Sequence, residues 1–159
     1  MLAVVISIAN HTLEKSPSPK DFISALSGRL HAMARAYGLL SRTNWKEAPL
    51  AELVQHEVEA FGSDRFKISG PQVSLIPQQG LSVGLVIHEL ATNASKYGAL
   101  SKANGIVDIA WKVADDELQL VWAEKDGPAV KQPDQEGFGL ALVKGEIAYR
   151  LRGEVETFF

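Results

Sequence analysis

Residues 88–98 read His-Glu-Leu-Ala-Thr-Asn-Ala-Ser-Lys-Tyr-Gly, and this stretch indicates more about the fold than any other part of the chain. It follows an apolar run at 85–87, and the pattern predicts a helix from about 79 to 97 that Gly98 ends. Glu89 and Asn93 are spaced i, i+4 and Lys96 follows Asn93 at i+3, so all three share one helix face. A carboxylate, an amide oxygen and a cation on one face can hold a hydrated Mg²⁺ beside a phosphate chain. The alternative is an ordinary solvated helix face.

Composition and charge limit the classes of protein to consider. The chain has 159 residues, 46% of them hydrophobic, which suits one domain or a small domain with a helical appendage. Its formal net charge of −3 and the lack of a basic stripe argue against nucleic-acid binding. It has no cysteine, which excludes disulfides and thiolate metal sites. No apolar run approaches the roughly 18–20 residues of a membrane-spanning helix, so we expect no membrane contact by this segment.

The first part of the chain predicts two helices and then a third. An apolar helix over 1–15 is stopped by Ser-Pro-Ser-Pro at 16–19, because proline disfavours helix in the residues before it. Apolar residues recur at helical spacing from about 21 to 41, which predicts a second helix and an antiparallel hairpin. This hairpin has too little core alone, so its apolar stripe must bury against the following domain or a second chain. A third helix is predicted over 50–60.

From about residue 62 the pattern becomes mixed. Residues 66–71 and 73–76 predict two short strands around a Gly-Pro turn. Alternating residues at 106–111 and 118–122 predict a meander that turns at Asp115 and Asp116. A polar loop over 124–136 precedes a helix over 139–150, and 153–159 predict the start of a further strand in which the chain stops.

Two further segments suggest a nucleotide site. Glu124 leaves a strand beside a glycine, where a carboxylate can accept a hydrogen bond from the exocyclic amine of adenine; alone, the segment is equally typical of an acidic turn. Gly137 and Gly139 precede a helix, and bare backbone N–H groups at a helix N-terminus suit phosphates, although one such pair is most often a turn. The dipeptide His88-Glu89 also begins a zinc-protease pattern, but Thr92 stands where the second histidine ligand is needed.

Taken together, these segments resemble the HWE family of bacterial sensor histidine kinases. That family is named for a histidine in its asparagine box and a Trp-x-Glu in its first glycine box, which His88 and the pair Trp122/Glu124 match. The resemblance runs through 88–101 and reaches upstream to Arg29-Leu30, 34–36, 39–40 and Gly70-Pro71. It implies an α+β fold: a Bergerat-type ATP-binding sandwich with a mixed sheet and helices on one face, after an antiparallel helical hairpin. The implied domains are a truncated hairpin over 1–44 and a catalytic ATP-binding domain over 45–159.

The resemblance also implies roles for individual residues. Asn93 would ligate Mg²⁺, and Glu89 would be the catalytic residue that orients or activates groups near the γ-phosphate. Lys96 would contact phosphate or ribose, and Tyr97 would line the adenine pocket. Glu124 would recognise adenine, although Asp126 stands where relatives usually carry glycine and is a second candidate. The implied nucleotide-binding residues of the two glycine boxes are Glu124, Asp126, Gly127, Gly137, Phe138, Gly139 and Leu140.

His88 and Trp122 have a structural interpretation beside the family one. His88 either lines the nucleotide site or packs in the core, and the sequence favours neither. Trp122 alternates with Leu120 along its strand and is expected in the core.

The histidine acceptor is the main departure from the family. In relatives it lies in a segment like His-Arg-x-Lys-Asn, directly before the apolar run that residues 2–5 resemble, so the acceptor is expected to be absent from these 159 residues. His11 and His31 lie on the hairpin and are not expected to replace it.

The resulting interpretation is a cytoplasmic histidine kinase fragment of a two-component system. It would use ATP and Mg²⁺, and the parent would transfer the γ-phosphoryl to a histidine and then to a response regulator receiver domain. A homodimer through the hairpin is a further candidate partnership. Two rival interpretations use the same fold: a Ser/Thr switch kinase, and an inactive partner-binding module.

Overall fold

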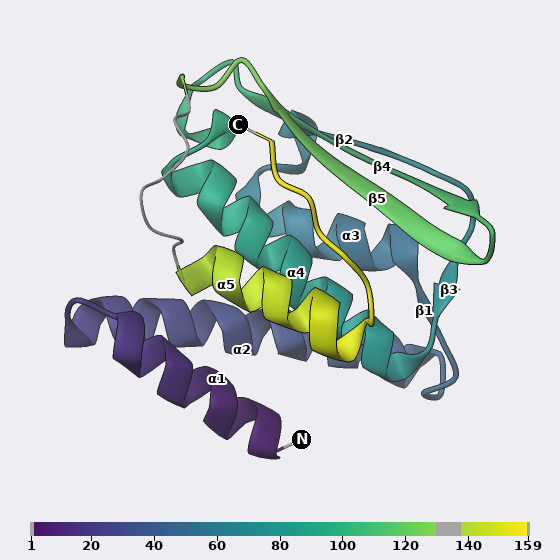
Figure 1. Ribbon diagram of the computed structural model, residues 1–159, viewed down its shortest axis with the longest axis horizontal. Coiled ribbons are helices and arrows are strands. Elements are labelled where there is room, and N and C mark those ends of the chain that lie inside the picture. The colour runs from purple at the N-terminus through teal and green to yellow at the C-terminus, as the bar shows by residue number, and fades with distance from the viewer. Residues whose placement is uncertain (1, 130–137, 159) are drawn as a thin grey trace.

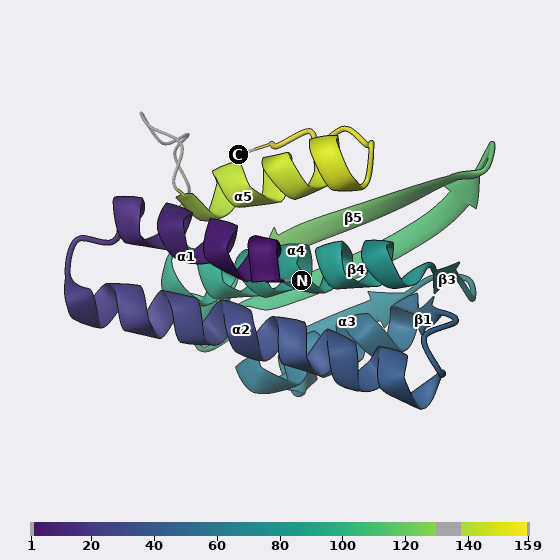
Figure 2. The same ribbon diagram turned by 90° about the horizontal axis from the view of Figure 1, so that it is seen from below.

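The fold is built around one long helix. The computed structural model describes residues 2–129 and 138–158. Helix α4 (Pro77–Lys96) lies between a three-stranded sheet on one side and the N-terminal helices on the other, as Figures 1 and 2 show. Helix α3 (Leu50–Val58) lies beside α4 on the same face of the sheet, and α5 (Phe138–Gly145) packs along α4 further out. The predicted α+β fold, with helices on one face of the sheet, is confirmed.

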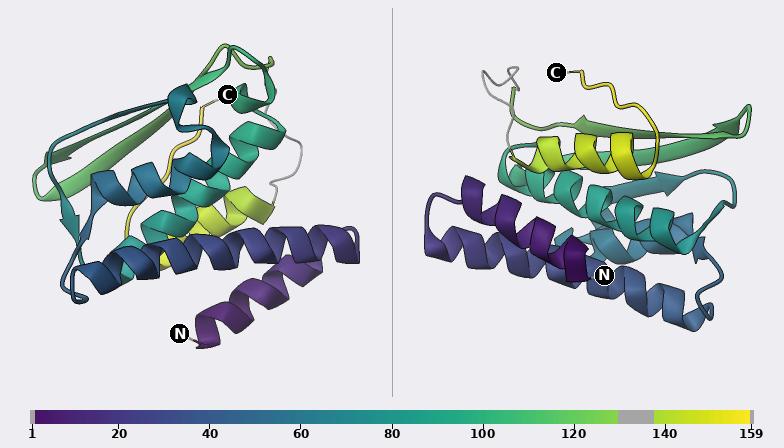
Figure 3. Two further views of the ribbon diagram at one scale, coloured as in Figure 1. Left: turned by 180° about the vertical axis from the view of Figure 1, so that it is seen from behind. Right: turned by 60° about the horizontal axis from the view of Figure 1, so that its bottom comes forward.

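The N-terminal helices form the predicted antiparallel hairpin. Helix α1 spans Leu2–Lys15 and α2 spans Pro19–Arg42, and Figure 3 shows them side by side. Ser18 begins α2, since its hydroxyl accepts a hydrogen bond from the Asp21 N–H at 3.2 Å. The apolar stripe of α2 buries against the following part of the same chain, where Ala36, Leu39 and Leu40 join the main core. The division into domains at residues 44 and 45 stays a prediction.

The main sheet has three strands in the order β2-β4-β5. Strand β2 (Phe66–Ser69) pairs in parallel with β4 (Ile106–Ala114), and β4 pairs antiparallel with β5 (Glu117–Lys125). The turn between β4 and β5 lies where it was predicted, at Asp115 and Asp116. Their φ angles of 52° and 61° are both left-handed, as a two-residue type I′ hairpin turn requires.

The strands on either side of the Gly-Pro turn exist but belong to different sheets. Strand β3 (Ser74–Leu75) pairs with β1 (Ala48–Pro49) and not with β2. The indole of Trp111 packs against this turn, because a Cβ at Gly70 would lie 2.4 Å from its ring. The indole N–H also donates to the Pro71 carbonyl at 2.8 Å, which holds the turn against β4.

The core fills the space between the sheet and the helices. From α4 it receives Val83, Ile87, Ala91 and Ala94, and further members come from α2, α3, the two sheets and the turn after α4. Short 3-10 turns at Glu59–Phe61, Ser63–Arg65 and Ala99–Ser101 connect these elements. Within the described ranges, no helix combines the length and apolar composition needed to cross a membrane.

The predicted C-terminal strand is wrong over the part of it that the structure describes. Residues 153–158 form no strand, and residue 159 lies outside the described ranges. The predicted helix over 139–150 continues from α5 as a π-helical turn over Glu146–Arg150, after which Arg152 is left-handed (φ 55°). The Gly153 N–H then donates to the Ile147 carbonyl at 2.9 Å, so the chain caps the helix here and has no hydrogen-bonded partner strand.

Candidate functional site

The polar face predicted on α4 runs from the core to the surface. Glu89 is buried, Asn93 is half-buried one turn further on, and Lys96 is exposed in the last turn. Tyr97 follows at the end of the helix and is 73% exposed. Lys96 and Tyr97 are therefore accessible to a ligand at this end of α4, and their contacts with phosphate, ribose or adenine stay predictions.

Glu89 is held by an arginine that the sequence analysis gave no role. Arg29 of α2 donates from Nε to Oε1 and from Nη2 to Oε2, both at 2.8 Å. A third donor, Nη1, reaches the hydroxyl of Thr12 on α1 at 3.0 Å. The side chains of Arg29 and Glu89 are only 6% and 4% exposed. The signal for this contact is an arginine inside the apolar stripe of α2, between Leu26 and Met33 at helical spacing.

Gly139 brings the start of α5 against the polar face of α4. A Cβ at this position would lie 3.1 Å from Oε2 of Glu89 and 3.2 Å from Oδ1 of Asn93. The missing side chain therefore lets the α5 backbone approach both polar groups. Leu140 follows, half-buried on α5, and the backbone of Phe138 begins this helix. Gly137 lies outside the described residues.

Glu124 is joined to the turn that follows α4. Its Oε2 accepts a hydrogen bond from the Ala99 N–H at 2.7 Å, and its Oε1 accepts one from the Trp122 indole at 3.2 Å. A Cβ at Gly98 would lie 1.9 Å from Oε2, so only glycine allows this approach. Gly127 also packs closely on this turn, since a Cβ there would lie 2.8 Å from the Cα of Ala99.

Asp126 and Trp122 differ in their surroundings. Asp126 is exposed and left-handed, with a φ angle of 57°. The choice between it and Glu124 as the acid for adenine stays open. Trp122 was expected in the core; it is half-buried at the edge of the main core, where it packs edge-on against Phe66 with 6.1 Å between the ring centroids.

Asn93 offers a donor that suits a magnesium ion. Among the residues that the structure describes, no group of three or more His, Asp or Glu side chains gathers into a metal cluster. Magnesium usually keeps several waters and binds one or two protein oxygens together with substrate phosphates, so it needs no cage of protein ligands. The amide oxygen of Asn93, which lies beside the α5 backbone at Gly139, is an oxygen ligand of the kind that fits that requirement.

His88 points away from this site. It packs between α2 and α3, where Nδ1 lies 3.4 Å from Nη2 of Arg35 and the ring lies 5.8 Å from that of Phe61. Arg35 in turn forms an ion pair with the buried Glu57 at 2.6 Å. Burial and then the charges of Arg35, Arg29 and His31 lower the pKa of His88 to about 4. Of the two interpretations of His88, the structure favours packing.

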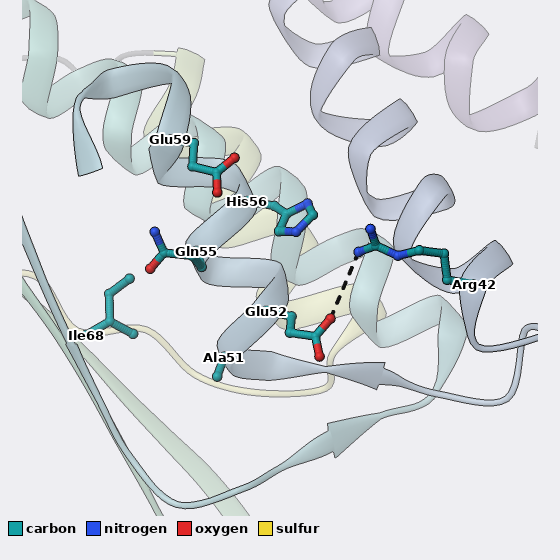
Figure 4. A pocket seen from close by; sticks show the side chains of 7 residues that line it. All are labelled: Arg42, Ala51, Glu52, Gln55, His56, Glu59 and Ile68. Atoms are coloured by element: carbon teal, nitrogen blue, oxygen red, sulfur yellow. Dashed lines mark ion pairs between the residues drawn. The ribbon is translucent and has the colours of Figure 1, made fainter. Parts of the chain in front are cut away.

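A separate groove lies along the outside of α3. Figure 4 shows its lining residues, Arg42, Ala51, Glu52, Gln55, His56, Glu59 and Ile68, around a volume of about 630 Å³. None of the predicted site residues lines it. Arg42 and Glu52 face each other across it with 3.9 Å between Nη2 and Oε2. The groove is thus distinct from the polar end of α4.

Comparisons with known proteins all find histidine kinases. The family model described as HWE histidine kinase matches residues 1–72. Curated blue-light-activated histidine kinases of Brucella ovis and Brucella anthropi are 34% identical over 165 aligned residues, which cover 99% of this chain. The same alignments cover 34% of each relative, so the chain spans about a third of their length.

Two solved structures share the fold. The histidine kinase domain of the Erythrobacter litoralis EL346 blue-light activated histidine kinase matches 91% of this chain and 83% of its own, with a TM-score of 0.61 and 16% identity. A structure titled as the EL346 kinase itself matches 92% of this chain and 51% of its own, with a TM-score of 0.66 and 19% identity. At these identities the likeness concerns the fold alone.

The buried Arg29–Glu89 pair generates a stability prediction. Arg29→Ala should lower the free energy of unfolding by about 3–5 kcal/mol, because it leaves the Glu89 carboxylate buried without its partner. Urea denaturation at neutral pH measures the change. The matched control is Arg42→Ala, whose pair with Glu52 is more than half exposed and should contribute at most about 1 kcal/mol. Equal, small losses in both variants would contradict the assigned pair.

His88 generates a prediction about pH. Its pKa is about 4 in the folded protein and near 6.5 when unfolded, so its neutral form stabilises the fold above pH 6.5 and this contribution is lost as the pH falls toward 4. Relative to His88→Gln, the wild-type free energy of unfolding should fall by up to about 1.4 kcal/mol per pH unit in that window. Urea titrations at several pH values measure both proteins. Parallel pH profiles would refute the assignment.

Proposed function

The chain belongs to the HWE family of histidine kinases, and we propose that it forms the ATP-binding part of a two-component sensor kinase. One observation carries the proposal: motifs far apart in the sequence meet around the end of α4. Gly139 lies against Glu89 and Asn93, and Glu124 is anchored by the turn directly after the helix. Such a convergence of a carboxylate, an amide oxygen and close-packed backbone is suited to a nucleotide.

The nucleotide would lie across this end of the helix. Glu124 would accept the exocyclic amine of adenine, with Asp126 as the alternative acid. Asn93 and Lys96 would face the phosphates together with the glycines before and within the start of α5. Asn93 would hold Mg²⁺, which neutralises charge on the phosphate chain when bound. The backbone N–H groups around Gly137 and Gly139 would donate hydrogen bonds to the same phosphates.

In the proposed reaction, a histidine imidazole takes the γ-phosphoryl group. The new bond joins phosphorus to an imidazole nitrogen, the bond from phosphorus to the β–γ bridging oxygen breaks, and ADP leaves. The imidazolium that forms loses one proton, which Glu89 would take. This chain contributes mainly positioning and charge. Glu89 would orient the incoming imidazole, because Arg29 fixes the carboxylate from one side while further lone pairs on its oxygens stay available.

The same proposal names the partners. ATP is the donor, and the phosphoryl group would pass from the histidine to a response regulator receiver domain. Such a kinase would act in the cytoplasm, where both are found. The hairpin, which we propose as a unit over 1–44 beside a catalytic unit over 45–159, exposes Ile6, Leu13 and Ile23. These apolar side chains make the hairpin the candidate surface for a homodimer.

Substitution of Asn93 tests the site. Asn93→Ala should weaken Mg-ATP binding at least about tenfold, or roughly 1.4 kcal/mol, because the cation loses its protein oxygen. Isothermal titration calorimetry with Mg²⁺ and with EDTA separates the metal-dependent part, which alone should be lost. Gln55→Ala, in the groove outside α3, is the control and should bind as the wild type does. Unchanged affinity in Asn93→Ala would sink the assignment.

The fate of the phosphoryl group gives a second test. None of the four histidines of this chain stands directly before the apolar run, where the family carries its acceptor: His11 and His31 follow it on the hairpin, His56 lines the α3 groove, and His88 is buried. We therefore expect that the 159-residue polypeptide binds ATP labelled at the γ-phosphate but acquires no acid-labile, base-stable phosphohistidine. Such a label on any of the four would overturn this part of the proposal.

A further inference from the structure

The guanidinium group of Arg65 donates hydrogen bonds to the backbone carbonyl groups of one turn. It ends the 3-10 turn Ser63–Arg65, directly before β2. Its Nε and Nη2 donate to the Gly105 carbonyl at 2.9 and 2.7 Å, and Nη1 donates to the Leu100 carbonyl at 3.0 Å. Nη2 also contacts the carbonyl oxygens of Ala99, at 3.3 Å, and Lys102. One side chain therefore binds four carbonyl groups of the segment 99–105, which follows α4.

The same turn holds Glu124 from the other side. The Ala99 carbonyl faces Arg65, whereas the Ala99 N–H donates to Oε2 of Glu124 at 2.7 Å. The turn has little freedom to shift, because a Cβ at Gly105 would lie 1.8 Å from the Ala99 oxygen. Gly127 also packs directly against Ala99, because a Cβ at Gly127 would lie 2.8 Å from the Ala99 Cα. A displacement of the turn would therefore move the N–H group that fixes the Glu124 carboxylate.

We propose that Arg65 is a positioning residue for base recognition: it holds the turn at 99–105 so that the Ala99 N–H aims Glu124 at the nucleotide base. The inference rests on the proposed function, since it takes Glu124 as the acid that reads adenine. A carboxylate can accept about four hydrogen bonds, so the Ala99 and Trp122 donors leave capacity for an exocyclic amine. Arginine is required because its planar fork spans several carbonyls, which the single ammonium of lysine cannot do.

The test compares two nucleotides that differ at the recognised group. ATP carries an exocyclic amine where ITP carries an oxygen, so the ratio of their Kd values reports on the Glu124 contact and not on the phosphates. Wild-type protein should prefer Mg-ATP by at least about tenfold, because a site built to accept that hydrogen bond discriminates strongly against an analogue without it. In Arg65→Lys the affinity for Mg-ATP should fall to near that for Mg-ITP, while the affinity for Mg-ITP changes less than about twofold.

Controls separate positioning from general damage. Arg42→Lys, an exposed arginine of the α3 groove, should keep the wild-type ratio. Glu124→Gln should lose the ratio as Arg65→Lys does, and the double variant should lose nothing further, because both act on one contact. Thermal unfolding checks that each variant is folded, and Arg65→Gln carries the same test if Arg65→Lys is not.

The possible outcomes separate the role of Arg65 from the proposed nucleotide-binding function. A wild-type protein that binds neither nucleotide would overturn the proposed function and this inference with it. Wild-type preference for ATP that survives in Arg65→Lys, or equal weakening of both nucleotides, would overturn the role of Arg65 alone. Loss of the preference with ITP binding retained is the result that we expect.

Discussion

The buried ion pair between Arg29 and Glu89 joins the helical hairpin to the rest of the molecule. Arg29 belongs to α2 and Glu89 to α4, and both carboxylate oxygens accept hydrogen bonds at 2.8 Å. Two charges removed from water in this way depend on each other, since either one alone would be strongly unfavourable. The position of α2 and the direction of the Glu89 carboxylate are therefore set together, and any movement of the hairpin along α4 would act on the polar face of that helix.

Helix α4 carries this constraint to the site. One of its sides fills the core with Ile87 and Ala91, and His88 packs toward α2 and α3. Its C-terminal end meets α5 at Gly139 and the turn that anchors Glu124. Three motifs that are separate in the sequence thus become neighbours because glycines allow backbone to approach side-chain oxygens. The proposed nucleotide site is built largely from backbone, with a few polar side chains to select the ligand.

Much of this arrangement follows from local pattern, and the rest depends on contacts between distant residues. The helical stripe of α4 and the position of the turn at Asp115 and Asp116 are local features, so the sequence predicts them. The partner of Arg29 is not local, because an arginine in an apolar stripe reveals burial but not which acid it meets. The pairing of β1 with β3 escaped prediction because such short strands, one containing Pro49, have almost no pattern. The strand predicted at 153–159 is wrong because a local pattern does not show whether a partner strand is available for pairing.

Hydrogen exchange with and without Mg-ATP tests the central claim, that the end of α4 and the segments packed on it form a nucleotide site. We expect that Mg-ATP slows amide exchange at 98–105, at 124–127 and at the start of α5, with no change along α3 at 51–59. The groove outside α3 is the internal comparison, since none of these segments lines it. Unchanged exchange at 98–105 and 124–127, or slowing confined to α3, would contradict the account.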